Sequence, residues 1–178
     1  MTVKPIDPEL WSVVEEQIDR DFGRGSAAHL CAGLMIVVVS SERKDSIFAI
    51  PPDWERYFSI DGNAFTINSM GVWLGDLADG QLKLSICAAE RIATSTKSKI
   101  VVSKRGAEAF TYGRGILRES VVRAAPGLVR DQRVIVEDED GVCLGVAALS
   151  VDIARLDRLS REDLVARNLI DIGWYVRA

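Results

Sequence analysis

The segment RVIVEDEDGVCLGVAAL, residues 133–149, predicts a β-hairpin. Two apolar runs, Val134 to Val136 within a strand expected over Arg133 to Glu137, and Val142 to Leu149, flank Asp140-Gly141, a dipeptide that favours a tight hairpin turn. The second run is apolar on both faces, as expected of a strand in a closed barrel. Gly145 inside this run indicates a bulge or a sharp bend.

Short strands with turn signals continue on both sides of this hairpin. We expect strands at Ile100 to Ser103, Ala109 to Thr111 and Val121 to Ala124, and a short helix from Gly113 to Ser120. Many short strands within about 80 residues are typical of a small barrel. Residues 97–178 are therefore expected to form a small β-barrel.

Residues 1–94 indicate an α+β domain with a mostly antiparallel sheet. Asp7-Pro8-Glu9 is expected to open a helix that ends at Gly23, because Asp caps free N–H groups and Pro fits the first helical turn. Further strands are expected at Cys31 to Val39, Ser46 to Ile50, Phe65 to Asn68, Val72 to Leu74 and Gln81 to Cys87. Short helices are expected to begin at Pro51-Pro52 and to cover Ala88 to Ala93. Turns are expected at Asp61-Gly62-Asn63 and at Asp79-Gly80. The small polar stretch from Thr94 to Ser98 marks the expected boundary between domains 1–94 and 97–178.

Charge divides unevenly between these two parts of the chain. Residues 1–94 carry a net charge of −6 and residues 95–178 carry +2, within a total of −4. This asymmetry favours an anionic partner for the second part, although scattered solubilising charge would give the same composition. Arg155, Arg158 and Arg161 recur at a spacing of three, which would bring them near one face of a helical turn.

Residues that would support catalysis are scarce. The chain has one histidine, His29, so a site built from several histidines is excluded, and no Gly-x-Ser-x-Gly surrounds any serine. Gly113 to Gly115 lacks the third glycine of a dinucleotide loop, and the acidic run from Glu137 to Asp140 is expected to be a solvated turn. We therefore expect no catalytic residue, metal or cofactor.

The remaining composition predicts a soluble protein of a reducing compartment. Three widely spaced cysteines, Cys31, Cys87 and Cys143, are expected to be buried reduced thiols. The apolar run from Leu30 to Val39 is too short to span a membrane, and the N-terminus does not have the pattern of a signal peptide.

Four stretches of the second part resemble a known RNA-binding fold. They are Lys99 to Ser103 with Gly106-Ala107-Glu108, Phe110 to Gly113 leading to Ile116-Leu117-Arg118, Gly141 to Ala148, and the closing DIGWYVR of residues 171–177. This pattern is similar to the PUA domain, and more closely to the Nip-seven family of large-subunit ribosome biogenesis factors, which carry a PUA domain at the C-terminus. The resemblance implies an N-terminal α/β domain followed by a PUA-type β pseudobarrel.

The sequence departs from the family pattern at two places. The stretch from Gly75 to Gly80 is acidic where the family tends to carry lysine and threonine. Trp174 replaces the usual glutamate of the closing motif, and we expect its indole to pack on the barrel.

The resemblance also implies which residues contact RNA. In PUA domains these contacts come from the short helix after the first hairpin and from basic residues near the last turn of the barrel. These positions correspond here to Arg114, Arg118, Arg155, Arg158 and Arg161, with Tyr112 and Gly113 shaping the turn. The basic residues Lys104 and Arg105 flank the first barrel strand and are added as candidates because of their charge. Gly113 would let the backbone approach a phosphate closely.

The expected function is therefore RNA binding in large ribosomal subunit assembly and pre-rRNA processing, without catalysis. Single-stranded or looped RNA is the expected ligand, because its bases are available for stacking. The acidic first domain is expected to bind ribosomal or assembly proteins, and the chain is expected to be a cytoplasmic or nucleolar monomer. Two alternatives stay open: an RNA-modifying enzyme or accessory subunit anchored by its PUA domain, and an adaptor whose barrel has lost RNA affinity.

Overall fold

The computed structural model describes residues 2–42, 44–58, 70–78 and 80–177. Their contacts form two compact units, one of residues 1–20 and 24–88 and the other of residues 21–23 and 89–178. This grouping divides the chain inside helix α3 (Ile86–Ala93), ahead of the expected boundary, so domain limits of 1–94 and 97–178 stay a prediction. Within the described residues, no helix is long and apolar enough to cross a membrane.

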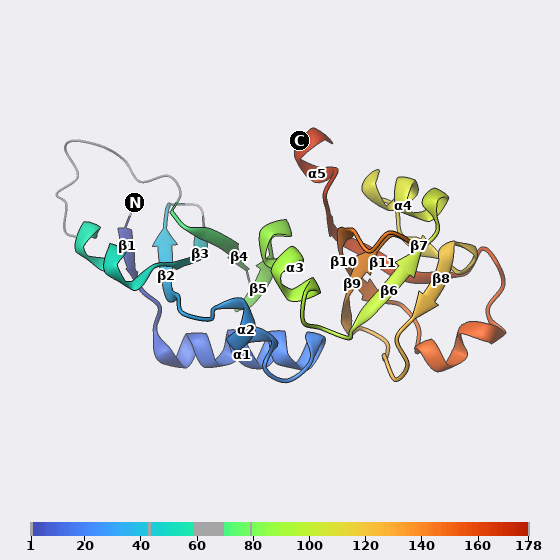
Figure 1. The fold of residues 1–178 in the computed structure, drawn as a ribbon, viewed down its shortest axis with the longest axis horizontal. Coiled ribbons are helices and arrows are strands. Elements are labelled where there is room, and N and C mark those ends of the chain that lie inside the picture. Colours follow the sequence, from blue (N-terminus) through green and yellow to red (C-terminus); the bar gives the residue numbers. More distant parts are fainter. Residues whose placement is uncertain (1, 43, 59–69, 79, 178) are drawn as a thin grey trace. The chain divides into compact units, whose positions relative to one another are not determined.

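The first unit contains an antiparallel sheet whose strands follow one another in chain order (Figure 1). Its strands are β1 (Thr2–Pro5), β2 (Met35–Ser40), β3 (Asp45–Ile50), β4 (Val72–Ala78) and β5 (Gln81–Leu84), and its helices are α1 (Pro8–Phe22), α2 (Ser26–Leu30) and the 3-10 helix η1 (Pro52–Tyr57). The Asp7 carboxylate accepts hydrogen bonds from the Glu9 and Leu10 N–H groups, so α1 begins where the sequence predicted. The Gln17 side chain bonds to both backbone groups of Leu82 and ties α1 to β5.

Two strands of this sheet are shorter than expected. The strand expected from Cys31 begins only at Met35, because residues 26–30 form α2 and Gly33, with φ +72°, turns the chain after it. The strand expected to reach Cys87 ends at Leu84, because the Ser85 hydroxyl accepts a hydrogen bond from the Ala88 N–H and starts α3.

Other expectations for the first unit fall at the edge of what the structure describes. The strand expected over Val72 to Leu74 continues to Ala78 as β4. Three expected features lie outside the described residues: the turn at Asp61-Gly62-Asn63, the strand at Phe65 to Asn68, and Asp79 of the turn at Asp79-Gly80.

The second unit contains a nearly closed, barrel-like sheet of six strands in the order β7-β11-β10-β9-β6-β8. These strands are β6 (Lys99–Val102), β7 (Ile116–Leu117), β8 (Val121–Ala124), β9 (Arg133–Glu137), β10 (Cys143–Leu149) and β11 (Leu164–Asp171). Only the pairing of β6 with β9 is parallel among the described ladders. Apolar side chains from the strands and from α4 (Lys104–Thr111) fill the interior, among them Ile100, Phe110, Val134 and Leu149.

Two expectations for this unit are wrong. The segment from Ala109 to Thr111 is the end of helix α4 and not a strand, because Ser103 caps the helix at the Gly106 N–H and Phe110 turns into the core. The segment from Gly113 to Ser120 is not a helix but a loop, strand β7 and the 3-10 helix η2 (Arg118–Ser120). Gly113, with φ +84°, ends α4 and starts this change of direction.

Apart from the helical turn indicated by the spacing of Arg155, Arg158 and Arg161, no secondary structure was expected after Leu149. This part of the chain forms the 3-10 helix η3 (Ile153–Arg158), strand β11 and the short helix α5 (Trp174–Arg177). Strand β11 pairs with β10 and β7, so it is needed to close the barrel.

The bulge predicted at Gly145 is present. The register between β9 and β10 shifts between Cys143 and Gly145, and Gly145 has φ +148°. A Cβ at this position would collide with the Ile170 carbonyl oxygen of β11. Both the backbone conformation and the close approach therefore require glycine.

We predict that Gly145→Ala lowers the free energy of unfolding by at least ~3 kcal/mol, because β10 and β11 must separate to admit the methyl group. Gly127→Ala is the matched control: Gly127 also has a positive φ, +78°, but no atom lies within 4 Å of its Cβ position. Its cost should be only about 1 kcal/mol. Equal effects of the two changes in thermal denaturation would contradict the close approach.

Candidate nucleic-acid interface

Four of the predicted arginines lie where η2 meets η3. The Arg118 Nε donates to the Leu156 carbonyl oxygen at 2.9 Å, which joins the two 3-10 helices. Arg161 follows η3 and reaches back to Glu119 of η2 at 3.2 Å. We call Arg118, Arg155, Arg158 and Arg161 the η2–η3 cluster. The fold therefore brings together side chains that are far apart in the sequence: Arg118 and Arg161 are more than 40 positions apart.

The members of the η2–η3 cluster differ in their availability to a ligand. Arg118 is largely covered and lies 3.8 Å from the Asp157 carboxylate, and Arg161 is paired with Glu119. Arg155 and Arg158 are exposed, and neither forms an ion pair with the described part of the chain. Residues three apart eclipse one another in a 3-10 helix, so η3 presents these two arginines on one side. Arg161 lies beyond the end of η3.

Helix α4 adds Lys104 and Arg105 to this region. The Ser103 N–H donates to the Ser120 carbonyl oxygen at 2.9 Å, so the start of α4 lies beside the end of η2. Both basic side chains are exposed, and neither is ion-paired within the described residues. They occupy the first turn of a helix, where the backbone dipole adds positive potential and where no carboxylate offsets it.

The other predicted residues lie at the opposite end of α4. Tyr112 follows the helix and is 74% exposed, Gly113 turns the chain, and Arg114 is exposed without an ion pair to any described residue. Eight helical residues span about 12 Å. The nine predicted residues therefore divide into two groups, one at each end of α4, and do not form a single patch.

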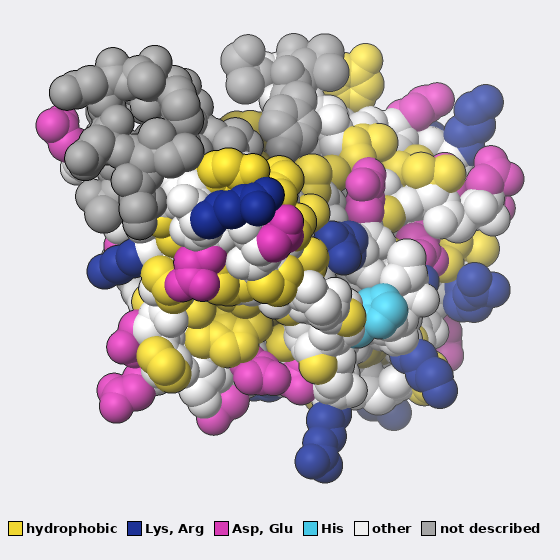
Figure 2. Space-filling view, turned by 60° about the vertical axis from the view of Figure 1, so that its left-hand side comes forward, with side chains coloured by type: hydrophobic (Ala, Val, Ile, Leu, Met, Phe, Trp, Pro, Cys, Tyr) yellow, Lys and Arg dark blue, Asp and Glu magenta, His cyan; other side chains and the backbone are white. Residues whose placement is uncertain are grey.

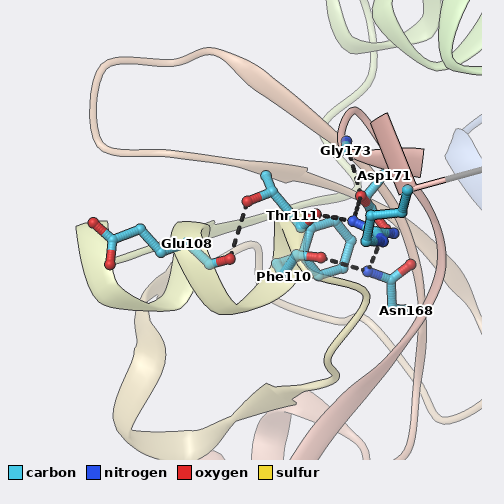
Figure 3. A network of polar contacts seen from close by, with 7 residues as sticks. Glu108, Phe110, Thr111, Asn168, Asp171 and Gly173 are labelled. Carbon is cyan, nitrogen blue, oxygen red and sulfur yellow. Dashed lines mark hydrogen bonds and ion pairs between the residues drawn. The ribbon is translucent and has the colours of Figure 1, made fainter. Parts of the chain in front are cut away.

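A network of polar contacts holds the end of α4, and sequence reasoning did not predict it (Figure 3). The Asp171 carboxylate is 2% exposed and accepts hydrogen bonds from the Gly173 N–H, at 2.9 Å, and from the Asn168 side chain, at 3.0 Å. Arg177 donates two hydrogen bonds to Asp171, at 2.8 and 3.0 Å. We call Asn168, Asp171, Gly173 and Arg177 the closing network. All four belong to the last strand or to the DIGWYVR motif.

The closing network satisfies carbonyl groups that the end of α4 leaves free. Asn168 donates to the Phe110 carbonyl oxygen at 2.8 Å, and Arg177 donates to the Thr111 carbonyl oxygen. A Cβ on Gly173 would collide with that same oxygen of Thr111, so the motif requires glycine there. The hydrogen bond to Asp171 raises the pKa of the Arg177 guanidinium above its ordinary value.

Other residues singled out in the sequence have different roles. Glu137 is buried and pairs with Lys99 at 2.6 Å, so it is not part of a solvated turn. Asp138 shapes the turn itself by accepting from the N–H groups of Asp140 and Val142. Across the described ranges, no three His, Cys, Asp or Glu residues are placed to hold a metal ion.

The expected burial of the cysteines is wrong, and Trp174 is more exposed than expected. None of the three thiols forms a disulfide within the described part of the chain; Cys87 is exposed on α3, and Cys31 and Cys143 are half-buried. Burial raises the pKa of the Cys143 thiol to about 11, so this group is not an activated nucleophile. Trp174 was expected to pack on the barrel but is 48% exposed.

Comparison with known families finds a match within the second unit. Residues 98–178 match the family model of the UPF0113 PUA domain. The predicted fold class, an α+β chain with a C-terminal PUA-type pseudobarrel, is confirmed.

Known proteins resemble this chain beyond the PUA domain. The 60S ribosome subunit biogenesis protein nip7 of Schizosaccharomyces pombe is 28% identical over 110 residues, and the match spans 61% of each protein. A hypothetical protein of Pyrococcus horikoshii covers 99% of both chains with a TM-score of 0.67 at 13% identity. A conserved PUA domain protein of Thermoplasma acidophilum covers 99% of this chain and 98% of its own, with a TM-score of 0.64 at 10% identity. The resemblance to the Nip-seven family is confirmed, and the solved structures show that the fold extends through both units.

We predict that Asp171→Ala lowers the free energy of unfolding by about 2 to 3 kcal/mol, because the donors of the closing network lose a buried acceptor. Asp157→Ala is the matched control. The Asp157 side chain is 99% exposed, and the change removes only a long ion pair with Arg118, whose N–O distance is 3.8 Å. That change should alter stability by less than ~0.5 kcal/mol. Urea denaturation of both variants measures the difference, and equal midpoints would exclude a stabilising role for Asp171.

We also predict selective alkylation of the thiols at pH 8. A pKa of about 11 leaves the Cys143 thiolate roughly 300-fold scarcer than that of an ordinary thiol, and burial restricts access further. Iodoacetamide should therefore label the exposed Cys87 at least ~100-fold faster than Cys143, as measured by peptide mass spectrometry. Labelling of Cys143 should rise as the pH approaches 11 or when the chain is denatured. Equal rates in the folded protein at pH 8 would contradict the burial.

Proposed function

We propose that this protein binds single-stranded or looped RNA through its PUA domain and acts in assembly of the large ribosomal subunit and in pre-rRNA processing. The observation that carries the proposal is the pair of exposed arginines on η3, Arg155 and Arg158, which no described carboxylate neutralises. Their place on a UPF0113 PUA domain and the likeness to a protein named for 60S subunit biogenesis support it.

The chemistry of arginine explains how this surface would hold RNA. A guanidinium group binds phosphate through two parallel hydrogen bonds and also stacks on the face of an unpaired base. Lys104 and Arg105 extend the positive potential from η3 toward the start of α4. Arg118 and Arg161 contribute less free charge, since Asp157 and Glu119 lie beside them. Their main role in this proposal is to hold η2 and η3 together.

The acidic N-terminal part has a different role in this proposal. Residues 1–94 carry a net charge of −6, which repels RNA and attracts basic proteins. Figure 2 shows Asp and Glu side chains gathered at the lower left of the face that it presents. We propose that this part contacts ribosomal or assembly proteins, and that the protein works as a monomer in the cytoplasm or the nucleolus.

The proposal includes no catalytic step. The relative that supports it is named as a biogenesis protein, and the PUA domain is an RNA-binding module. Turnover in a methylation or uridine-isomerisation assay with bulk RNA would favour an RNA-modifying enzyme instead.

We predict that the double variant Arg155→Ala/Arg158→Ala weakens binding to a labelled oligouridine and also weakens its salt dependence. If about four phosphates are neutralised, affinity of the unchanged protein falls roughly 50-fold between about 50 and 200 mM salt, and loss of two contacts reduces the slope of log K against log salt by about 1.4. Fluorescence anisotropy at several salt concentrations measures both quantities.

The matched control for this experiment is Lys4→Ala/Arg56→Ala, which removes the same charge from exposed side chains of the first unit. It should leave both the affinity and the slope unchanged. An equal loss in the two double variants would mean that net charge alone governs binding. Unaltered binding after loss of Arg155 and Arg158 would remove η3 from the interface.

A further inference from the structure

Two exposed aromatic side chains flank the point where the chain's last helix meets α4. Tyr112 directly follows Thr111 and is 74% exposed, and Trp174 directly follows Gly173 and is 48% exposed. Gly173 lies against the Thr111 carbonyl oxygen, which leaves no room for a side chain between the two segments. From standard backbone dimensions, the Cα atoms of Tyr112 and Trp174 are at most about 10 Å apart.

The closing network keeps these two backbone segments together. Arg177 joins α5 to the Thr111 carbonyl oxygen, and its other hydrogen bonds go to the buried Asp171 carboxylate (Figure 3). Asn168 makes the second connection, to Phe110 at 2.8 Å. The backbones that carry both aromatic rings are therefore held before any ligand arrives, which lowers the entropic cost of binding.

We propose that Tyr112 and Trp174 form a stacking platform for unpaired nucleobases of single-stranded RNA. This inference rests on the proposed function and adds a second contact region to it, at the opposite end of α4 from the η2–η3 cluster. Aromatic side chains beside a positively charged groove are the usual means of holding single strands, because every base offers a π-face while the charges hold the backbone.

The charges around the platform favour RNA over an apolar protein partner. Arg114 is exposed and has no ion pair among the described residues, and it lies two positions after Tyr112. The Arg177 side chain is 32% exposed and lies beside Gly113, whose Cβ position is 3.3 Å from the guanidinium. A phosphate that follows a stacked base would therefore approach a segment that carries the exposed Arg114 and lies beside the Arg177 guanidinium.

The test is binding of the full chain to an oligouridine and to a matched oligonucleotide whose internal bases are removed. Tyr112→Ala and Trp174→Ala should each weaken oligouridine binding between about 5-fold and 150-fold, the range for loss of one stacked base. They should leave binding to the abasic oligonucleotide and the salt slope unchanged. Tyr112→Phe and Trp174→Phe should retain most of the affinity, because the ring faces remain.

Ile172→Ala is the matched control, since Ile172 is also an exposed apolar side chain of the same segment but has no π-face. It should bind RNA as the unchanged protein does. The platform is overturned if the Ala variants bind oligouridine within about twofold of the unchanged protein, or if Ile172→Ala or the Phe variants lose as much as they do. The proposed function can survive that outcome, since salt-dependent binding through Arg155 and Arg158 is read separately. If the unchanged chain binds neither oligonucleotide, both proposals fail.

Discussion

The buried Asp171 carboxylate is the interaction on which the rest of the PUA domain surface depends. A carboxylate that is 2% exposed must be neutralised and hydrogen-bonded, and Arg177, Asn168 and the Gly173 N–H do this together. Arg177 and Asn168 also donate hydrogen bonds to the carbonyl oxygens of Thr111 and Phe110 at the end of α4. The two side chains that Asp171 orients therefore also fix the position of α4.

Helix α4 in turn sets the distance between the two candidate contact regions. Its start lies beside η2 through the hydrogen bond from Ser103 to Ser120, and its end lies against Gly173. The eight residues of α4 thus separate two regions. The unpaired cations of η3 and of the first turn of α4 lie at its start, and the aromatic side chains lie at its far end. The two regions are therefore separated by the length of this helix, about 12 Å.

The sequence predicted some of these features and missed others for identifiable reasons. The hairpin of β9 and β10, the bulge at Gly145 and the start of α1 were correct, because each depends on residues close together in the chain. Helix α4 was missed because the eight residues KRGAEAFT form a short segment that includes a glycine and has Phe110 as its one large apolar side chain. The close approach of Gly106 to Ser120 and Val102 explains that glycine. Among the site residues, the sequence indicated Arg155 and Arg158, but it did not reveal that Glu119 and Asp157 lie beside Arg161 and Arg118.

By itself, the sequence determined the resemblance to PUA-domain proteins, the mostly antiparallel first part, the barrel-like second part and the excess of basic residues in that second part. Turn residues, helix caps and motif spacing are enough to predict these features, because each of these signals depends only on residues close together in the chain. The tertiary structure decided which cations are free, which are paired, and that Asp171 and Arg177 hold the end of α4. These outcomes depend on partners up to 66 positions apart, which no local pattern relates, and burial of a charge has meaning only once the chain has folded around it.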